Sequence, residues 1–364
     1  MPHKSITRVL PAIENLAVPQ LAPAKLLQLQ SSRCGLSTTG TKAILKERLE
    51  DAILNAKPIP PSARILSIDL GLRNFAFSLF TIPPTSPLIN NPKPKPKAKQ
   101  KPKAPPFIAL HTWRHIDLVS TLTSNPTSLP TTEPPSKQPT FTPSTLAPLT
   151  TTLILTDLLP LKPTHILIER QRFRSASQAT VLEWTLRVNT LESMLYASLT
   201  TIKALNPALW DGELIAVPPK RVVRYLEGQG LLEGEQALGV LREVEGEGAP
   251  IKAKVTAREQ KKRKIKLLEG LLEQGRVEIG SEEAGAMVEV FMEKHGRDGK
   301  KGEKGVDWKA GRRGRKKKCE CEGEDVLTKK DDLSDCLLQG MAWLQWQRNL
   351  ADLQRRANWS GEQE

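Results

Sequence analysis

The sequence predicts an α/β fold in which helices pack on one mixed sheet. Two observations carry this prediction. Five apolar runs of strand length follow residue 60, and the first three of them come before the long helical patterns begin. The later runs alternate with helical patterns. Early strands followed by alternating helices and strands are typical of a mixed sheet that helices cover.

The expected strands are short apolar runs that end at turn residues or polar residues. They cover Arg64–Asp69, Phe75–Thr81, Phe107–Ile116, Thr164–Glu169 and Glu213–Val217. Only the turn Gly71–Asn74 separates the first two runs, which predicts a hairpin.

The expected helices show an apolar period close to 3.6 residues. They cover about 145–159, 175–203, 218–227 and 332–350. The last of them contains Trp343 and Trp346. These tryptophans could stack on bases, but we expect them to pack in the core beside the leucines of the same helix.

Three tracts interrupt this pattern, and the first two are predicted to be loops. Residues 82–106 are rich in Pro and Lys, and residues 120–148 are rich in Thr, Ser and Pro. Residues 227–325 form a charged insertion rich in Gly, Glu and Lys. Two stretches in it, Lys261–Leu272 and Glu282–Met292, have helical periodicity, and the rest is predicted to be disordered.

Five acidic residues are the candidate functional residues. Asp69 and Glu169 each end an expected strand, and Asp331, Asp332 and Asp335 open the last expected helix. Carboxylates aimed at one point form an oxygen-rich cage, which suits Mg²⁺. Two such ions can activate a water and stabilise a leaving oxygen during phosphodiester hydrolysis. The pattern therefore predicts a metal-dependent site.

The helix leaves the choice of its ligands open. Residues three and four apart share a helix face, so either Asp331 or Asp332 can act with Asp335. Each acid also has a simpler interpretation. An Asp at a helix start is often a cap, Asp69 could be a turn residue, and Glu169 could be a solvated charge at a strand end.

The composition favours a polyanionic partner. The chain has 364 residues, with 54 Lys and Arg against 40 Asp and Glu, a net charge of +14. Nucleic acid is the commonest partner of such a protein. We expect no membrane span, because we find no apolar run of about 18 residues. The four cysteines fit a reducing compartment better than a disulfide framework.

Three motifs resemble those of the fungal mitochondrial Holliday junction resolvases, which are RuvC-like nucleases with an RNase H-type fold. The motifs are Ile68–Asn74, Ile168–Ser175 and Lys329–Asp335. The resemblance covers roughly residues 62–118, 145–227 and 326–350. It implies a nuclease domain over 62–350, with a mixed five-stranded RNase H-like sheet in which the first and fourth strands are neighbours.

The resemblance also implies a function and a ligand set. The family's enzymes are homodimers that use Mg²⁺ or Mn²⁺ to make paired symmetric nicks in four-way DNA junctions. Carried over to this sequence, Asp69, Glu169 and Asp335 are metal ligands and catalytic residues, and Asp331 or Asp332 is the fourth. Two ions per active site and a mitochondrial location are expected. A helix around Ala176–Leu199 is a candidate dimer interface, or it packs on the sheet.

Basic residues near the acids are the candidate DNA contacts. Arg170, Gln171, Arg172 and Arg174 follow Glu169 directly. Arginine binds two phosphate oxygens with its planar fork, although these residues could also form a solvated helix start. Arg73, in the turn after Asp69, is a further candidate. The run at residues 312–318 is either a flexible phosphate contact or a solvated tract.

The N-terminal region has a second resemblance. Residues 21–57 contain two short helices around Gly35–Lys42 and are similar to the SAP motif, a small helical DNA-binding module. Lys42 would then contact DNA. An ordinary helical hairpin whose leucines face a core is the alternative. Residues 1–20 are a possible targeting segment, although they have few of the arginines and serines typical of one.

Three functions are therefore considered. The first is an endonuclease that resolves four-way DNA junctions. The second is a non-catalytic protein that binds or tethers DNA. The third is another RNase H-fold nuclease that acts on RNA or on transposon ends. The complete acidic set favours an enzyme, because a pure binder gains nothing from carboxylates that face phosphate.

Overall fold

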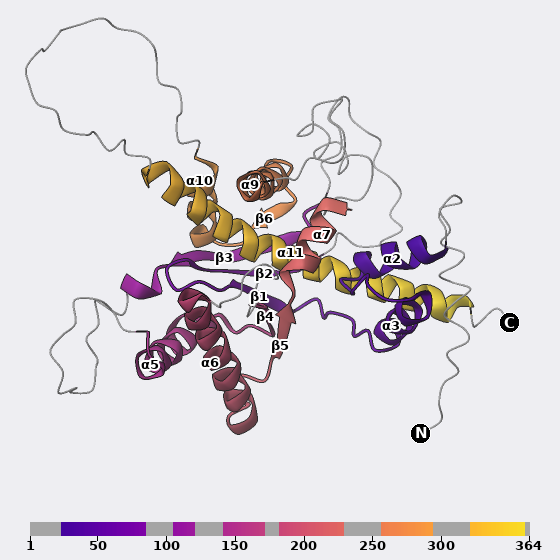
Figure 1. Ribbon diagram of the computed structural model, residues 1–364, viewed down its shortest axis with the longest axis horizontal. Helices are drawn as coiled ribbons and strands as arrows, with labels where there is room; N and C mark the ends of the chain where they lie inside the picture. Colours follow the sequence, from indigo (N-terminus) through magenta and orange to yellow (C-terminus); the bar gives the residue numbers. More distant parts are fainter. Residues whose placement is uncertain are drawn as a thin grey trace, which may run out of the picture.

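The computed structural model describes residues 23–84, 105–120, 141–171, 182–228, 256–293 and 321–360 (Figure 1). Within these ranges the chain forms one mixed sheet of six strands, in the order β5-β4-β1-β2-β3-β6. The strands are β1 (Arg64–Asp69), β2 (Phe75–Thr81), β3 (Ile108–Ile116), β4 (His165–Glu169), β5 (Glu213–Val217) and β6 (Val277–Ile279).

The pairing of the strands confirms the expected mixed sheet. β2 is antiparallel to both β1 and β3, whereas β4 and β5 continue the sheet in parallel with β1. Ile68 of β1 pairs with Ile168 of β4. The next residues, Asp69 and Glu169, are therefore at neighbouring strand ends, as expected.

The expectation of five strands was wrong. The sixth strand, β6, pairs in parallel with β3 at the edge of the sheet. It has only three residues, too few to show a period, and it lies in the tract that was predicted to be an insertion. The part of this tract from 256 to 293 is folded onto the sheet. Residues 227–228 end α7 and residues 321–325 begin α11, whereas 229–255 and 294–320 are outside the described ranges.

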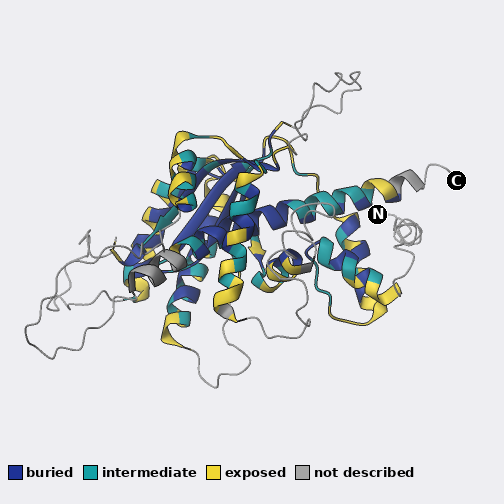
Figure 2. Cartoon of the chain, turned by 90° about the horizontal axis from the view of Figure 1, so that it is seen from above, coloured by how far each residue is buried: buried dark blue, intermediate teal, exposed yellow. Residues whose placement is uncertain are grey.

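Helices cover both faces of the sheet. They are α5 (Pro143–Leu153) and α6 (Glu183–Leu205) on one face, and α7 (Pro219–Gly228), α9 (Ala257–Glu273), α10 (Glu282–Met292) and α11 (Cys321–Ser360) on the other. Figure 1 shows α5 and α6 below the sheet and α9, α10 and α11 above it. Figure 2 shows the buried residues concentrated in the sheet and on the helix faces that cover it.

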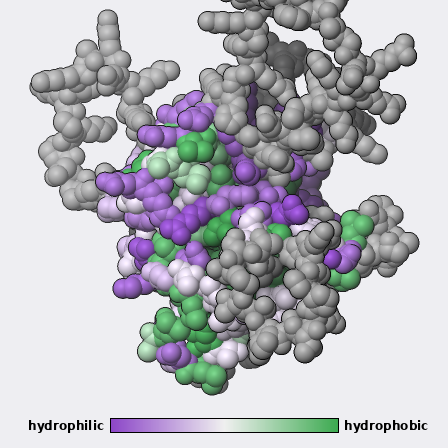
Figure 3. Space-filling model, turned by 90° about the vertical axis from the view of Figure 1, so that its left-hand side faces the viewer, coloured by the Kyte–Doolittle hydropathy of each residue, from purple (hydrophilic) through white to green (hydrophobic). Residues whose placement is uncertain are grey.

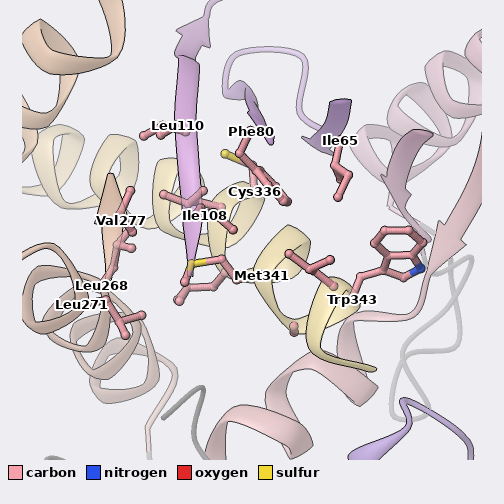
Figure 4. Packing of buried hydrophobic residues seen from close by; sticks show 14 of the residues in the cluster. Ile65, Phe80, Ile108, Leu110, Leu268, Leu271, Val277, Cys336, Met341 and Trp343 are labelled. Atoms are coloured by element: carbon pink, nitrogen blue, oxygen red, sulfur yellow. The ribbon is translucent and has the colours of Figure 1, made fainter. Parts of the chain in front are cut away.

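The sheet has one hydrophobic core on each face, and successive side chains of a strand alternate between them. Ile65 faces the core under α11 and its neighbour Leu66 faces the core under α6, because successive strand residues point to opposite sides. Figure 4 shows Ile65, Phe80 and Met341 packed together with residues of α9 and β6. Trp343 and Trp346 are buried in this same core, which confirms their expected packing role.

The segment Pro143–Leu161 corrects the statement that the chain has no apolar run of about 18 residues. It is long and apolar enough to cross a membrane by length and composition. It is, however, a composite of α5, a π-helical turn over Ile154–Leu158 and a 3₁₀ turn over Leu159–Leu161. Its residues Leu146 and Leu158 are fully buried against the sheet. Core packing therefore explains its apolar character.

The N-terminal segment forms the expected pair of helices, α2 (Pro23–Arg33) and α3 (Lys42–Leu54). Their leucines pack against Leu350 and Leu353 of α11, which extends beyond the expected end at residue 350. Gly35 adopts a φ of 66° under Trp346, and a Cβ there would lie 2.2 Å from Cδ2 of the indole. The glycine of the SAP-like pattern thus permits this contact.

Candidate active site

Two carboxylates meet at the end of the sheet. Asp69 ends β1 and is 9% exposed, and Glu169 ends the adjacent parallel strand β4. Burial raises the pKa of Asp69 well above its ordinary value, and the nearby charges of Glu169, Asp335 and Asp332 raise it further. Asp69 is therefore within electrostatic reach of three other acids.

Helix α11 delivers two of these acids. Asp332 and Asp335 are three residues apart and share a helix face. Burial raises the pKa of Asp335 to about 7 against the opposing charge of Lys264. Burial also raises the pKa of Asp332. Both shifts arise because carboxylates that lose water lose the solvation of their charged form.

Asp331 has different partners. Its carboxylate lies 2.9 Å from Nζ of Lys261 and 2.9 Å from Nζ of Lys264, both on α9. Its side chain is 6% exposed. Asp332, by contrast, is among the charges that raise the pKa of Asp69. The two acids that the sequence could not separate therefore occupy different environments.

Lys264 is a buried cation inside this group of acids. Its Nζ lies 2.6 Å from Oδ1 and 2.5 Å from Oδ2 of Asp335, in addition to its contact with Asp331. Burial opposes the charged form of Lys264, but the two carboxylates outweigh burial and raise its pKa above the usual value. Lys264 is therefore a cation when it meets these acids.

His115 closes another side of the site. It lies on β3 opposite Ala76, which in turn pairs with Asp69. Its Nε2 is 3.7 Å from Oδ2 of Asp332, and its side chain is 12% exposed. Asp69, Ala76 and His115 thus lie side by side on β1, β2 and β3, and this register places the imidazole of His115 beside the carboxylates of α11.

The position of α11 over the sheet is fixed by buried hydrogen bonds. The indole Nε1 of Trp113 donates to the carbonyl of Leu333 at 3.0 Å. Gln339 Nε2 donates to the carbonyl of Ile68 at 3.2 Å, one residue before Asp69. These bonds join the helix to β3 and β1 on either side of Asp335. They therefore set the height and rotation at which the acids of α11 meet Asp69.

The donor set fits a hard divalent cation. Its ligands are carboxylate oxygens, and Oδ2 of Asp332 is buried without a hydrogen-bond partner. In the described ranges, no three His, Cys, Asp or Glu side chains are drawn together closely enough to coordinate an ion as they stand. Neighbouring carboxylates repel one another and so help to raise the pKa of Asp69 and of Asp335. A divalent cation bound between them would remove this repulsion.

The expected DNA contacts lie in several places. Arg73 is exposed in the turn between β1 and β2, four residues after Asp69. Arg170 is exposed just after β4, and its backbone N–H donates to the carbonyl of Val217. Both arginines follow strands that end at the acids. They remain predicted contacts.

The other expected DNA contacts are less close to the acids or are not described. Gln171 is partly buried, and its backbone N–H donates to Oε1 of Glu192 at 3.4 Å. Lys42 is exposed at the start of α3. Arg172 and Arg174 lie outside the described ranges.

Sequence reasoning missed four side chains near the site. They are Lys261, Lys264, His115 and Glu192. Burial raises the pKa of Glu192, which lies near Glu169. The periodicity over Lys261–Leu272 revealed a helix, but no pattern in it showed that this helix would dock against the acids.

The acid end of the sheet has a hydrophilic surface. In Figure 1 the end of β3 and the first part of α11 lie on the left. Figure 3 looks at that side and shows hydrophilic residues gathered in a band across the middle of the face. A polar face at this end of the sheet suits a charged substrate.

Comparisons with known proteins identify the fold and the family. The chain is 35% identical over 179 residues to the mitochondrial cruciform cutting endonuclease 1 of Schizosaccharomyces pombe. This alignment spans 49% of the chain and 56% of that relative. The structure also resembles the crystal structure of the yeast mitochondrial Holliday junction resolvase Ydc2. The TM-score is 0.52 at 24% identity, over 94% of this chain and 99% of the other.

The structural likeness shows an RNase H-like fold of the Ydc2 type. A family model described as "Mitochondrial resolvase Ydc2 / RNA splicing MRS1" matches residues 65–353. That range contains the described strands, except for the first residue of β1, and all five candidate acids. Because the match covers most of the chain, the protein belongs to the Ydc2/MRS1 family of mitochondrial resolvases and RNA-splicing proteins.

Proposed function

We propose that this protein is a metal-dependent, structure-selective endonuclease that resolves four-way (Holliday) DNA junctions by paired symmetric nicks in mitochondrial DNA recombination. The supporting observation is the convergence of Asp69, Glu169, Asp332 and Asp335, whose mutual charges raise the pKa of Asp69. The names of the relatives, a cruciform cutting endonuclease and a Holliday junction resolvase, support the choice of substrate.

The acids favour an enzyme over the other activity in the family's description, RNA splicing. Buried carboxylates that repel one another destabilise a fold, and they also repel phosphate. A protein that only binds nucleic acid gains nothing from them. A nuclease gains metal ligands. The same reasoning disfavours a DNA tether without catalytic activity.

The proposed metal ligands are Asp69, Glu169, Asp332 and Asp335, with Asp331 in a supporting role. When bound, two Mg²⁺ or Mn²⁺ ions would supply an activated water and stabilise the leaving oxygen. The preference of Mg²⁺ for oxygen ligands matches the four carboxylates. His115 would orient Asp332 from its other side.

The basic side chains near the acids have a separate task. Arg73 and Arg170 would hold the phosphate that enters the site, since each is exposed and follows a strand that ends at an acid. Lys264 would hold Asp331 and Asp335 in position through its three short contacts. Substrate position and acid position would then be set by different residues.

A two-fold dimer would place two such sites on one junction. Paired nicks require two sites, and closed two-fold symmetry is the commonest arrangement of homo-oligomers. The inner face of α6 packs on the sheet through Leu191 and Leu195. The start of α6 leaves Leu182, Trp184 and Leu186 exposed. These three residues are the proposed contact with the second subunit.

Cleavage of defined substrates tests the proposal. Purified full-length protein is incubated with Mg²⁺ and a labelled four-way DNA junction, next to a DNA duplex, an RNA–DNA hybrid and a structured RNA. We expect paired nicks in the junction only, and none in EDTA. Cleavage of the hybrid alone would identify a different nuclease. Binding of the RNA without any cleavage would favour the splicing activity.

A further inference from the structure

We propose that the outward edge of α9 is a binding ridge for the sugar-phosphate backbone of a DNA arm that leads into the acid site. The ridge consists of Arg258, Lys262 and Lys266. The inference rests on the proposed function only for the choice of DNA as the nucleic acid. The evidence for an anion-binding ridge comes from the helix itself.

One side of α9 is anchored to the protein. The helix begins at a capping box formed by Thr256 and Glu259. Its residues Leu268 and Leu271 are buried in the core below α11. On the same side Lys261 and Lys264 form the ion pairs with the acids of α11. The helix is therefore fixed in place next to the candidate metal ligands.

The other side of α9 carries three exposed cations. Glu259, which is also exposed, is bound to Thr256 in the capping box and is near the charge of Lys262. Arg258, Lys262 and Lys266 are four residues apart, so they form one stripe along the helix. All three are exposed. Within the described part of the chain, the ion pairs of α9 involve its inward lysines and not these three residues.

This arrangement is unfavourable for an isolated protein. Like charges at i and i+4 destabilise a helix by about 0.2–0.5 kcal/mol per pair, and Arg258 is also near the positive end of the helix dipole. A solvated helix face usually alternates acids and bases instead. A stripe of one sign is therefore better explained by an external polyanion that balances it.

The spacing of the stripe fits a nucleic-acid backbone. Eight residues separate Arg258 from Lys266, which is about 12 Å along the helix axis. That length of duplex presents roughly three to four phosphates of one strand. Three cations on long side chains can therefore each meet a phosphate. The anchoring of α9 at Asp331 and Asp335 fixes the distance from these phosphates to the acid site.

The test measures binding of a four-way DNA junction in EDTA, where cleavage is absent. The variant R258Q/K262Q/K266Q is compared with the control variant K57Q/K162Q/R355Q. The control removes the same charge from exposed positions that lie away from α9. Each lost phosphate contact reduces the log–log salt slope by about 0.9, so the ridge variant should lose roughly 2.7 units of slope. Its melting temperature should equal or slightly exceed that of the wild type, because the substitutions remove two repulsive like-charge pairs.

Several outcomes would overturn the inference. One is a change in slope for the ridge variant no larger than for the control. Another is unchanged DNA binding with weaker binding of a four-way RNA junction, which would identify RNA as the partner. The variant K262E/K266E provides a second check and should bind more weakly than the ridge variant. A wild-type protein that binds the junction but never cleaves it would refute the proposed function. The salt-slope comparison would still decide whether the ridge binds DNA.

Discussion

The ammonium of Lys264 lies 2.5 and 2.6 Å from the two carboxylate oxygens of Asp335. It brings a cation from α9 into a group of acids supplied by β1, β4 and α11. Each carboxylate oxygen has a second lone pair, so Asp335 can keep this contact and still accept another ligand. The insertion between β5 and α11 is thus part of the acid site.

The first prediction concerns Asp69. The variant D69N keeps the size of the side chain but removes one anionic ligand, so it should abolish junction cleavage while junction affinity in EDTA stays within about threefold. The exposed Asp211→Asn is the control and should cleave normally. Cleavage by D69N at the wild-type rate would refute the metal site. Loss of binding as well would indicate that Asp69 is structural.

The second prediction separates Asp332 from Asp331. D332N should eliminate cleavage, because its charge acts on Asp69 directly. D331N removes only the partner of two lysines, so it should slow cleavage by roughly 10- to 100-fold, as is usual for residues that orient ligands. Single-turnover rates at saturating protein provide the comparison. The reverse order of rates would exchange the proposed roles.

The third prediction concerns the stability of the protein without metal. K264Q leaves Asp331 and Asp335 without their shared cation in a site where the lysine side chain is only 21% exposed. Breaking a fully buried pair costs roughly 3–5 kcal/mol, and partial exposure reduces this to about 1–3 kcal/mol. Denaturant unfolding measures the change. The exposed neighbour variant K262Q should stay within about 0.5 kcal/mol of the wild type.

Sequence periodicity predicted most of the fold. The runs Phe75–Thr81 and Glu213–Val217 are strands with the expected bounds, and Glu282–Met292 is a helix with the expected bounds. In each of these segments the spacing of apolar residues within the segment itself indicates the structure. Strand β6 has three residues and depends on pairing with β3, so no local pattern could reveal it.

The candidate site was predicted only in part for a similar reason. Asp69 and Glu169 could be paired because the family resemblance implies that the first and fourth strands are neighbours, and parallel neighbours end at the same edge. The docking of α9 could not, since an apolar stripe shows which face is buried but not what covers it. Only the structure brings Lys264 to Asp335 and so distinguishes the surroundings of Asp331 and Asp332.

The fourth prediction concerns pH. The pKa of Asp335 is raised to about 7, above its value in the unfolded chain, so the folded protein binds more protons between these two values. Without metal, stability should therefore fall as the pH rises from about 4 to 7, by up to about 1.4 kcal/mol per unit for one group. Unfolding in EDTA at pH 5, 6 and 7 measures the slope. D335N should reduce the slope without removing it, because Asp69 and Asp332 also have raised pKa values, and D211N should leave the slope unchanged.

The fifth prediction separates DNA binding by the SAP-like helices from their structural role. Leu49 is fully buried and α3 packs on Leu350 and Leu353, so removing residues 1–57 would expose the end of α11. The variant K42Q avoids this problem, because Lys42 is exposed at the start of α3. If Lys42 contacts one phosphate, the salt slope should decrease by about 0.9 while the saturated cleavage rate stays unchanged. L49A should instead lower stability by about 2–5 kcal/mol. An unchanged slope in K42Q would favour an ordinary helical hairpin whose main task is to cover α11.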